Sequence, residues 1–134
     1  MTSDKPTDNN TNDHLIEVSV ETEYLPMQSQ PESDRYVFAY HITITNQGPV
    51  EAKLLTRHWV IIDADQKRQE VNGVGVIGEQ PLIASGDSYD YSSGVVLSTP
   101  VGTMHGSYQF VDPMGIHLEA PVHPFLLAMP NKVH

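Results

Sequence analysis

The sequence contains no cysteine among its 134 residues. Disulfide bonds, thiolate metal sites and thiol catalysis are therefore excluded. A small protein without cysteine fits a reducing compartment, and we predict a cytoplasmic location. No run of about 18 apolar residues occurs either, so no segment is expected to insert into a membrane.

Positive charge is scarce. Seven Lys and Arg residues stand against 17 Asp and Glu residues, for a formal net charge of −10, and no Lys or Arg occurs from Gln69 to Asn131. Proteins bind nucleic acids by neutralising phosphates with Lys and Arg, and basic residues also attract proteins to anionic membranes. The composition therefore excludes nucleic acid as a partner, disfavours anionic membrane surfaces and predicts a solvated acidic surface.

Apolar residues are missing from residues 2–13. Such a segment cannot bury enough surface to offset the entropy of ordering, so we predict a disordered tail over residues 1–13. The tail has neither arginine nor an apolar stretch, and we do not expect it to act as a transit or signal peptide. Residues 14–134 are predicted to form one domain with one core.

Most of the remaining sequence alternates between apolar and polar residues, as β-strands do. The clearest case is 35–46, where one face carries Tyr36, Phe38, Tyr40, Ile42 and Ile44. Further strands are expected at 15–21, 54–62, 67–71, 88–97, 103–111, 116–118 and 124–129.

Seven or more short strands, with no helical periodicity over ten residues, favour an all-β fold. We predict an immunoglobulin/fibronectin type III-like β-sandwich of two antiparallel sheets. Trp59, the only tryptophan, falls on the third strand, where immunoglobulin-like sandwiches bury one.

Three glycines, Gly73, Gly75 and Gly78, form the pattern G-x-G-x-x-G, which binds phosphate in dinucleotide-binding folds. There the glycines precede a helix whose N-terminal amides hold the pyrophosphate. The residues after Gly78 include Pro81 and cannot continue as a helix. The favoured interpretation is that the glycines permit positive φ, a bulge or close packing. The alternative is a nucleotide or pyrophosphate sensor whose amides form the phosphate site.

Four segments resemble the ApaG family in their order and in their glycine and aromatic positions: 57–63, 71–82, 89–94 and 99–108. The resemblance extends from about Ile16 to Pro130. Two segments depart from the usual family pattern. Ser85-Gly86-Asp87 replaces Pro-Gly-Glu, and Val122-His123-Pro124-Phe125 replaces Ile-Pro-x-Phe. Both departures affect turn or edge geometry and leave the expected fold unchanged.

The resemblance implies the sandwich fold and a bacterial cytoplasmic protein encoded near a diadenosine tetraphosphate hydrolase. It also implies a link to cobalt resistance and magnesium efflux. Eukaryotic relatives carry the domain within multidomain proteins, as an interaction module. The family brings no established catalytic residues, so none is assigned here.

The family link to divalent ions draws attention to seven histidines: His14, His41, His58, His105, His117, His123 and His134. None forms a His-x-His or His-x-x-x-His pair, the spacing with which one strand or helix presents two ligands on one face. We therefore predict no metal site and no cofactor, and interpret the histidines as surface or packing residues. A divalent-cation binder remains the second alternative.

Catalytic groups are not apparent. Ser92 and Ser93 precede Gly94 but do not form G-x-S-x-G. Asp63 and Asp65 flank a turn, where aspartates usually accept hydrogen bonds from local amides. No nucleophile lies beside a base in the sequence, so we predict that the protein is not an enzyme.

Two tyrosines, Tyr89 and Tyr91, share one face of their strand, with Asp90 on the other. Tyrosine is enriched in protein interfaces, so we predict these two residues as a protein contact. The sequence thus predicts a non-enzymatic domain that acts through an unidentified protein partner. It leaves a homo-oligomer open.

Overall fold

The computed structural model describes residues 15–131. The tail predicted over residues 1–13 lies outside them. The strands are β1 (Ile16–Tyr24), β2 (Tyr36–Asn46), β3 (Ala52–Asp63), β4 (Arg68–Val74), β5 (Leu82–Ile83), β6 (Ser88–Leu97), β7 (Val101–Val111) and β8 (His117–Ala128). Two short 3-10 turns, η2 (Pro26–Gln28) and η3 (Pro31–Ser33), connect β1 to β2. No helix within 15–131 is long and apolar enough to cross a membrane.

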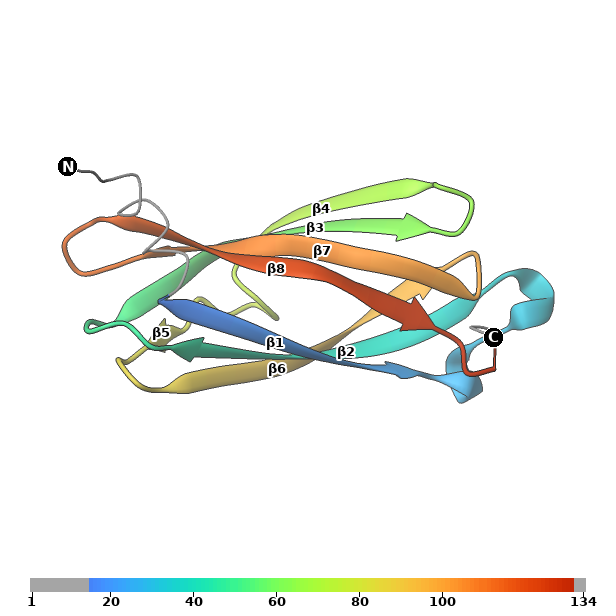
Figure 1. Ribbon diagram of the computed structural model, residues 1–134, viewed down its shortest axis with the longest axis horizontal. Helices are drawn as coiled ribbons and strands as arrows, with labels where there is room; N and C mark the ends of the chain where they lie inside the picture. Colours follow the sequence, from blue (N-terminus) through green and yellow to red (C-terminus); the bar gives the residue numbers. More distant parts are fainter. Residues whose placement is uncertain (1–14, 132–134) are drawn as a thin grey trace, which may run out of the picture.

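The strands form two antiparallel sheets that pack face to face (Figure 1). One sheet has the order β1-β2-β6, and the other has the order β4-β3-β7-β8, with β5 paired to the start of β3. The predicted β-sandwich is confirmed. The Thr22 hydroxyl of β1 donates to the Leu126 carbonyl of β8 at 3.5 Å along one side. Strands β4 and β6 form the edges on the other side.

Alternation along each strand places the apolar residues between the sheets. The predicted inner face of β2 is buried at Phe38, Tyr40, Ile42 and Ile44. Trp59 lies 2% exposed at the centre of the core, with its ring edge-on to Tyr40 and Tyr108 at centroid distances of 5.6 and 5.7 Å. Such edge-to-face pairs add to the stabilisation from apolar burial.

The two final strands predicted at 116–118 and 124–129 were wrong, because β8 runs unbroken from His117 to Ala128. The strand tolerates Pro121 and Pro124 because it is an edge strand, which has no ladder partner on one side. The pairing with β7 also shifts between Met104 and Gly106, and this irregularity accommodates the proline-containing segment.

Candidate functional site

The last glycine of the fingerprint belongs to a tight turn. Val76 and Glu79 exchange both main-chain hydrogen bonds, at 2.8 and 2.9 Å. The two residues between them, Ile77 and Gly78, have φ of 48° and 75°. Positive φ at both central positions is the geometry of a type I′ hairpin turn, which favours glycine.

The other two glycines make room for close neighbours. A Cβ on Gly75, whose φ is +64°, would lie 2.2 Å from the Glu79 carbonyl oxygen. A Cβ on Gly73 would lie 2.5 Å from Nη1 of Arg57. The Gly75 amide donates to the Leu55 carbonyl at 2.8 Å, and the Val76 and Glu79 amides are used within the turn. Three amides of the glycine segment, residues 73–79, are therefore already bonded within the protein.

Arg57 projects from β3 into the space between the sheets. It lies opposite Gly73 on β4, and its Nη1 donates to the Gly75 carbonyl at 2.8 Å. No carboxylate among residues 15–131 lies within ion-pair distance of its guanidinium. Arg57 is not among the site residues predicted from the sequence. The two-residue period from Trp59 is the signal that would have found it, because residues 57 and 59 share one strand face.

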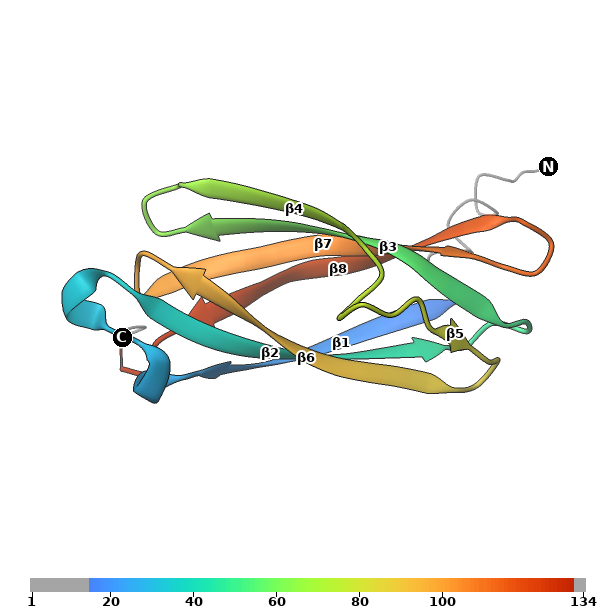
Figure 2. The ribbon, with the colours of Figure 1, turned by 180° about the vertical axis from the view of Figure 1, so that it is seen from behind.

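A cleft of about 430 Å³ opens beside Arg57, between β3 and β4 of one sheet and β6 of the other. Its walls carry three aromatic residues, Tyr40, Trp59 and Tyr91, and its glycine side is formed by Gly73, Val74 and the turn after them. Figure 2 shows this side of the sandwich, where the chain leaves β4 and descends towards β6 before reaching β5. None of the residues described as lining the cleft is Asp, Glu, His or Lys.

The tyrosine pair predicted as a protein contact points inwards. Tyr91 is 9% exposed, and its hydroxyl is hydrogen-bonded to that of Tyr108. Tyr89 is half-buried and packs against the core. Burial raises the pKa of Tyr91 to about 12 and raises that of Tyr108 as well, although the nearby Arg57 charge opposes both shifts. Both hydroxyls thus stay protonated at neutral pH, where they serve as hydrogen-bonding groups and not as bases.

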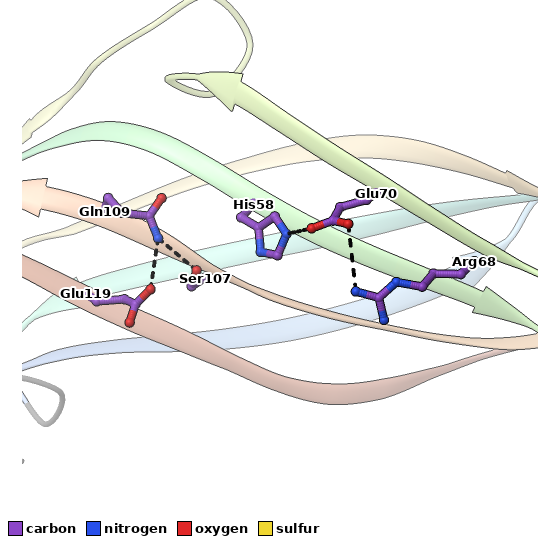
Figure 3. A network of polar contacts seen from close by, with 6 residues as sticks. All are labelled: His58, Arg68, Glu70, Ser107, Gln109 and Glu119. Carbon is purple, nitrogen blue, oxygen red and sulfur yellow. Dashed lines mark hydrogen bonds and ion pairs between the residues drawn. The ribbon is translucent and has the colours of Figure 1, made fainter.

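A polar network covers the outer face of the larger sheet (Figure 3). The His58 ring is hydrogen-bonded through Nε2 to Glu70 Oε2 at 2.6 Å, and Arg68 Nη2 lies 3.8 Å from Glu70 Oε1. The hydrogen bond to His58 is the main cause that lowers the pKa of the Glu70 carboxyl. Gln109 extends the polar surface through bonds to Ser107 and Glu119.

A serine, a histidine and an aspartate meet on the outer face of the smaller sheet. His41 Nδ1 lies 2.6 Å from Ser92 Oγ, and His41 Nε2 lies 3.6 Å from Asp90 Oδ2. The sequence could not reveal this cluster, because the pairing of β2 with β6 creates it. The adjacent groove also holds Glu21 and Glu23. Their negative charge opposes the anion that forms when a serine attacks a carbonyl, so we interpret the cluster as a surface hydrogen-bond network.

The remaining predicted positions have local roles. Asp63 Oδ1 accepts hydrogen bonds from the amides of Asp65 and Lys67, both at 2.9 Å, as expected for a turn. No group of three His, Asp or Glu side chains within 15–131 approaches closely enough to hold a metal ion. His14 and His134 lie outside the described residues.

The sequence and the fold match known proteins. The family model described as the ApaG domain matches residues 26–112. The chain is 57% identical over 121 residues to Protein ApaG of Azotobacter vinelandii, covering 90% of this chain and 96% of that protein. Among solved structures, the Northeast Structural Genomics Consortium target SoR45 superposes with a TM-score of 0.86 at 48% identity, covering 91% of this chain and 92% of the other. The putative ApaA protein from Bordetella pertussis gives 0.84 at 49% identity, covering 87% and 94%.

Proposed function

Because the chain belongs to the ApaG-domain family, we propose that it is a non-catalytic interaction domain which holds an extended segment of a partner protein. The segment occupies the cleft between β4 and β6. The observation that supports this proposal is the composition of the cleft. Aromatic rings, aliphatic side chains and one arginine surround a volume of about 430 Å³. Such a lining matches the mostly apolar walls with few polar groups that are typical of binding sites.

The rim of the cleft favours a polypeptide over a compact ligand. Strands β4 and β6 each pair with only one neighbour, so each has a free edge beside the cleft. Free edges bind extended segments by adding main-chain hydrogen bonds. Val74 and Ile77, 71% and 61% exposed, extend the apolar surface outwards from the glycine side.

The lining also favours binding over catalysis. A general base or an activated nucleophile needs a group that exchanges protons near neutral pH. The described lining supplies neither carboxylate nor histidine, and the Tyr91 hydroxyl keeps its proton well above neutral pH. The cytoplasmic location and the links to cobalt resistance and magnesium efflux remain part of this proposal on the family resemblance alone.

The test is a peptide array probed with the purified protein and two variants. Random-sequence peptides are synthesised in pairs, one with a free C-terminal carboxylate and one amidated. Ser93 lines the cleft, so Ser93→Phe fills it. Ser92 precedes it on β6 and faces the opposite side, which makes Ser92→Phe the matched control.

We expect the wild-type protein and Ser92→Phe to bind the same peptides, and Ser93→Phe to lose at least about tenfold in affinity, as lost burial of one side chain implies. Equal binding by Ser93→Phe would move the interaction away from the cleft. No binding by any of the three proteins would contradict the proposed function.

A further inference from the structure

We propose that the cleft recognises the C-terminal end of the partner chain, with its terminal carboxylate bound by the Arg57 guanidinium. This inference rests on the proposed function and specifies which part of the partner enters the cleft. The last side chain then packs against the apolar rim of the cleft, where Val74 and Ile77 are exposed.

The charge of Arg57 is unmatched within residues 15–131. The sequence has 17 acidic residues. The ion pairs among residues 15–131 involve His41, His58 and Arg68, and none of them involves Arg57. Its Nη1 group is held by main-chain carbonyls, at 2.8 Å from Gly75 and 3.5 Å from Val74. A guanidinium presents five donors in a planar fork that fits a carboxylate. A ligand carboxylate therefore neutralises its charge and accepts its remaining hydrogen bonds.

Gly73 keeps this cation in place. Arg57 Nη1, Cζ and Nη2 lie 2.5, 2.6 and 2.8 Å from the position that a Cβ on Gly73 would take. The guanidinium thus lies directly over the Gly73 backbone, in space that any other residue would occupy. The first glycine of the fingerprint therefore acts through an arginine from the neighbouring strand.

The surroundings of Arg57 favour a chain end over an internal acidic residue. The glycine segment lines the cleft and supplies the carbonyl that holds the guanidinium. Figure 2 shows that the chain after β4 crosses towards β6 at this place. Val76 at the base of this segment is fully buried, so the segment is anchored to the core at this end of the cleft. We therefore expect a segment that lies along β4 and β6 to end where it meets Arg57.

The other polar groups are compatible with an anion. Tyr91 and Ser93 line the cleft, and the hydrogen bond between the Tyr91 and Tyr108 hydroxyls uses only one of their two protons. Neutral donors beside a guanidinium are typical of sites for carboxylates. With a single cation in the lining, the site suits a monoanionic carboxylate better than a polyphosphate.

The experiment measures acid and amide forms of the tightest array peptide, with N-acetyl-leucine and ATP as further probes. Binding is followed by the fluorescence of Trp59, the only tryptophan, and by the Arg57 Nε–Hε NMR signal. Arg57→Gln removes the charge, and Gly73→Ala displaces the guanidinium, whose atoms are the three nearest to the added Cβ. Arg68→Gln removes an exposed charge from the outer face and is the matched control.

We expect the free acid to bind about tenfold to a hundredfold more tightly than the amide, as a charged hydrogen-bonded pair implies. Arg57→Gln and Gly73→Ala should abolish this preference, whereas Arg68→Gln should keep it. Equal binding of acid and amide in a cleft that Ser93→Phe still blocks would overturn the inference and leave the proposed function standing. ATP shifting the Arg57 signal more strongly than the peptide acid would overturn the carboxylate assignment. Unchanged signals with every probe would contradict both proposals.

Discussion

Arg57 and Arg68 lie on neighbouring strands but face opposite sides of the same sheet. Arg68 is exposed and lies beside Glu70, which is hydrogen-bonded to His58. Arg57 points between the sheets and has only main-chain carbonyls as described partners. Exposed ion pairs contribute little to stability because water screens them, whereas a sheltered charge is stabilised strongly by the right counter-ion. The outer face is therefore solvated, whereas the inner face shelters a charge that the proposed ligand would neutralise.

The largest effect is expected from the residue beside Arg57. Trp59→Ala should lower the free energy of unfolding by about 3–5 kcal/mol, because it removes the largest buried side chain and leaves a cavity. His58→Ala, one position away on the outer face, should change it by less than about 1 kcal/mol. Urea unfolding followed by circular dichroism measures both. Similar losses for the two variants would contradict the contrast between the faces.

The tyrosine pair should show the next largest effect. Tyr108→Phe leaves the Tyr91 hydroxyl without its partner and should lower the free energy of unfolding by about 1–3 kcal/mol. The double variant Tyr91→Phe/Tyr108→Phe should lose less than the sum of the single variants, because neither hydroxyl is then left alone. Strict additivity in a double-mutant cycle would show that the bond has no energetic role. Gln109→Ala on the outer face should have a smaller effect than Tyr108→Phe.

Alkaline pH tests the same tyrosine pair by ionising the hydroxyls, without replacing either side chain. The pKa of Tyr91 is raised in the folded protein from its ordinary value of 10 to about 12. Its contribution to stability is therefore complete below pH 10 and is lost as the pH rises towards 12. The wild-type protein should lose stability over this interval more steeply than Tyr91→Phe/Tyr108→Phe. Parallel curves for the two proteins, measured by urea unfolding at each pH, would contradict the assignment.

The smallest effect belongs to the outer face. The pKa of Glu70 is lowered in the folded protein, chiefly by the hydrogen bond with His58. Its contribution is present above the ordinary pKa of 4.5 and is lost as the pH falls through the lowered folded value. Glu70→Gln should therefore be slightly less stable than wild type near neutral pH, and this difference should vanish in acid. A difference that persists in acid would assign the effect to packing.

Alternation along each strand predicted much of this fold, because it shows which side chains face the core and which face the solvent. The alternation from Tyr36 to Ile44 correctly placed its inner face in the core, and Trp59 was correctly placed on the third strand. Asp63 behaves as the turn residue that its neighbours indicated. The prediction failed at β8, which contains two prolines, since only its position at the edge of the sheet makes them acceptable.

The glycine fingerprint illustrates what a sequence motif can and cannot predict. The interpretation that the glycines serve backbone geometry and close packing agrees with the positive φ of Gly75 and Gly78 and with the close approach of Arg57 to Gly73. The nucleotide alternative remains a subject for the ATP titration. The sequence did not identify Arg57, because an arginine between two apolar stretches resembles an ordinary surface residue. Its role becomes visible once the strand face on which it lies is known.

The family, the all-β class and the face on which most side chains lie could be predicted from the sequence, because alternation and turn residues act over a few positions. The edge strands, and the residues that meet between neighbouring strands, follow from the tertiary structure. The register of β2 with β6 brought His41 to Ser92, and the return of β4 beside β3 brought Gly73 to Arg57. These meetings depend on contacts between separate strands, and no local pattern encodes them.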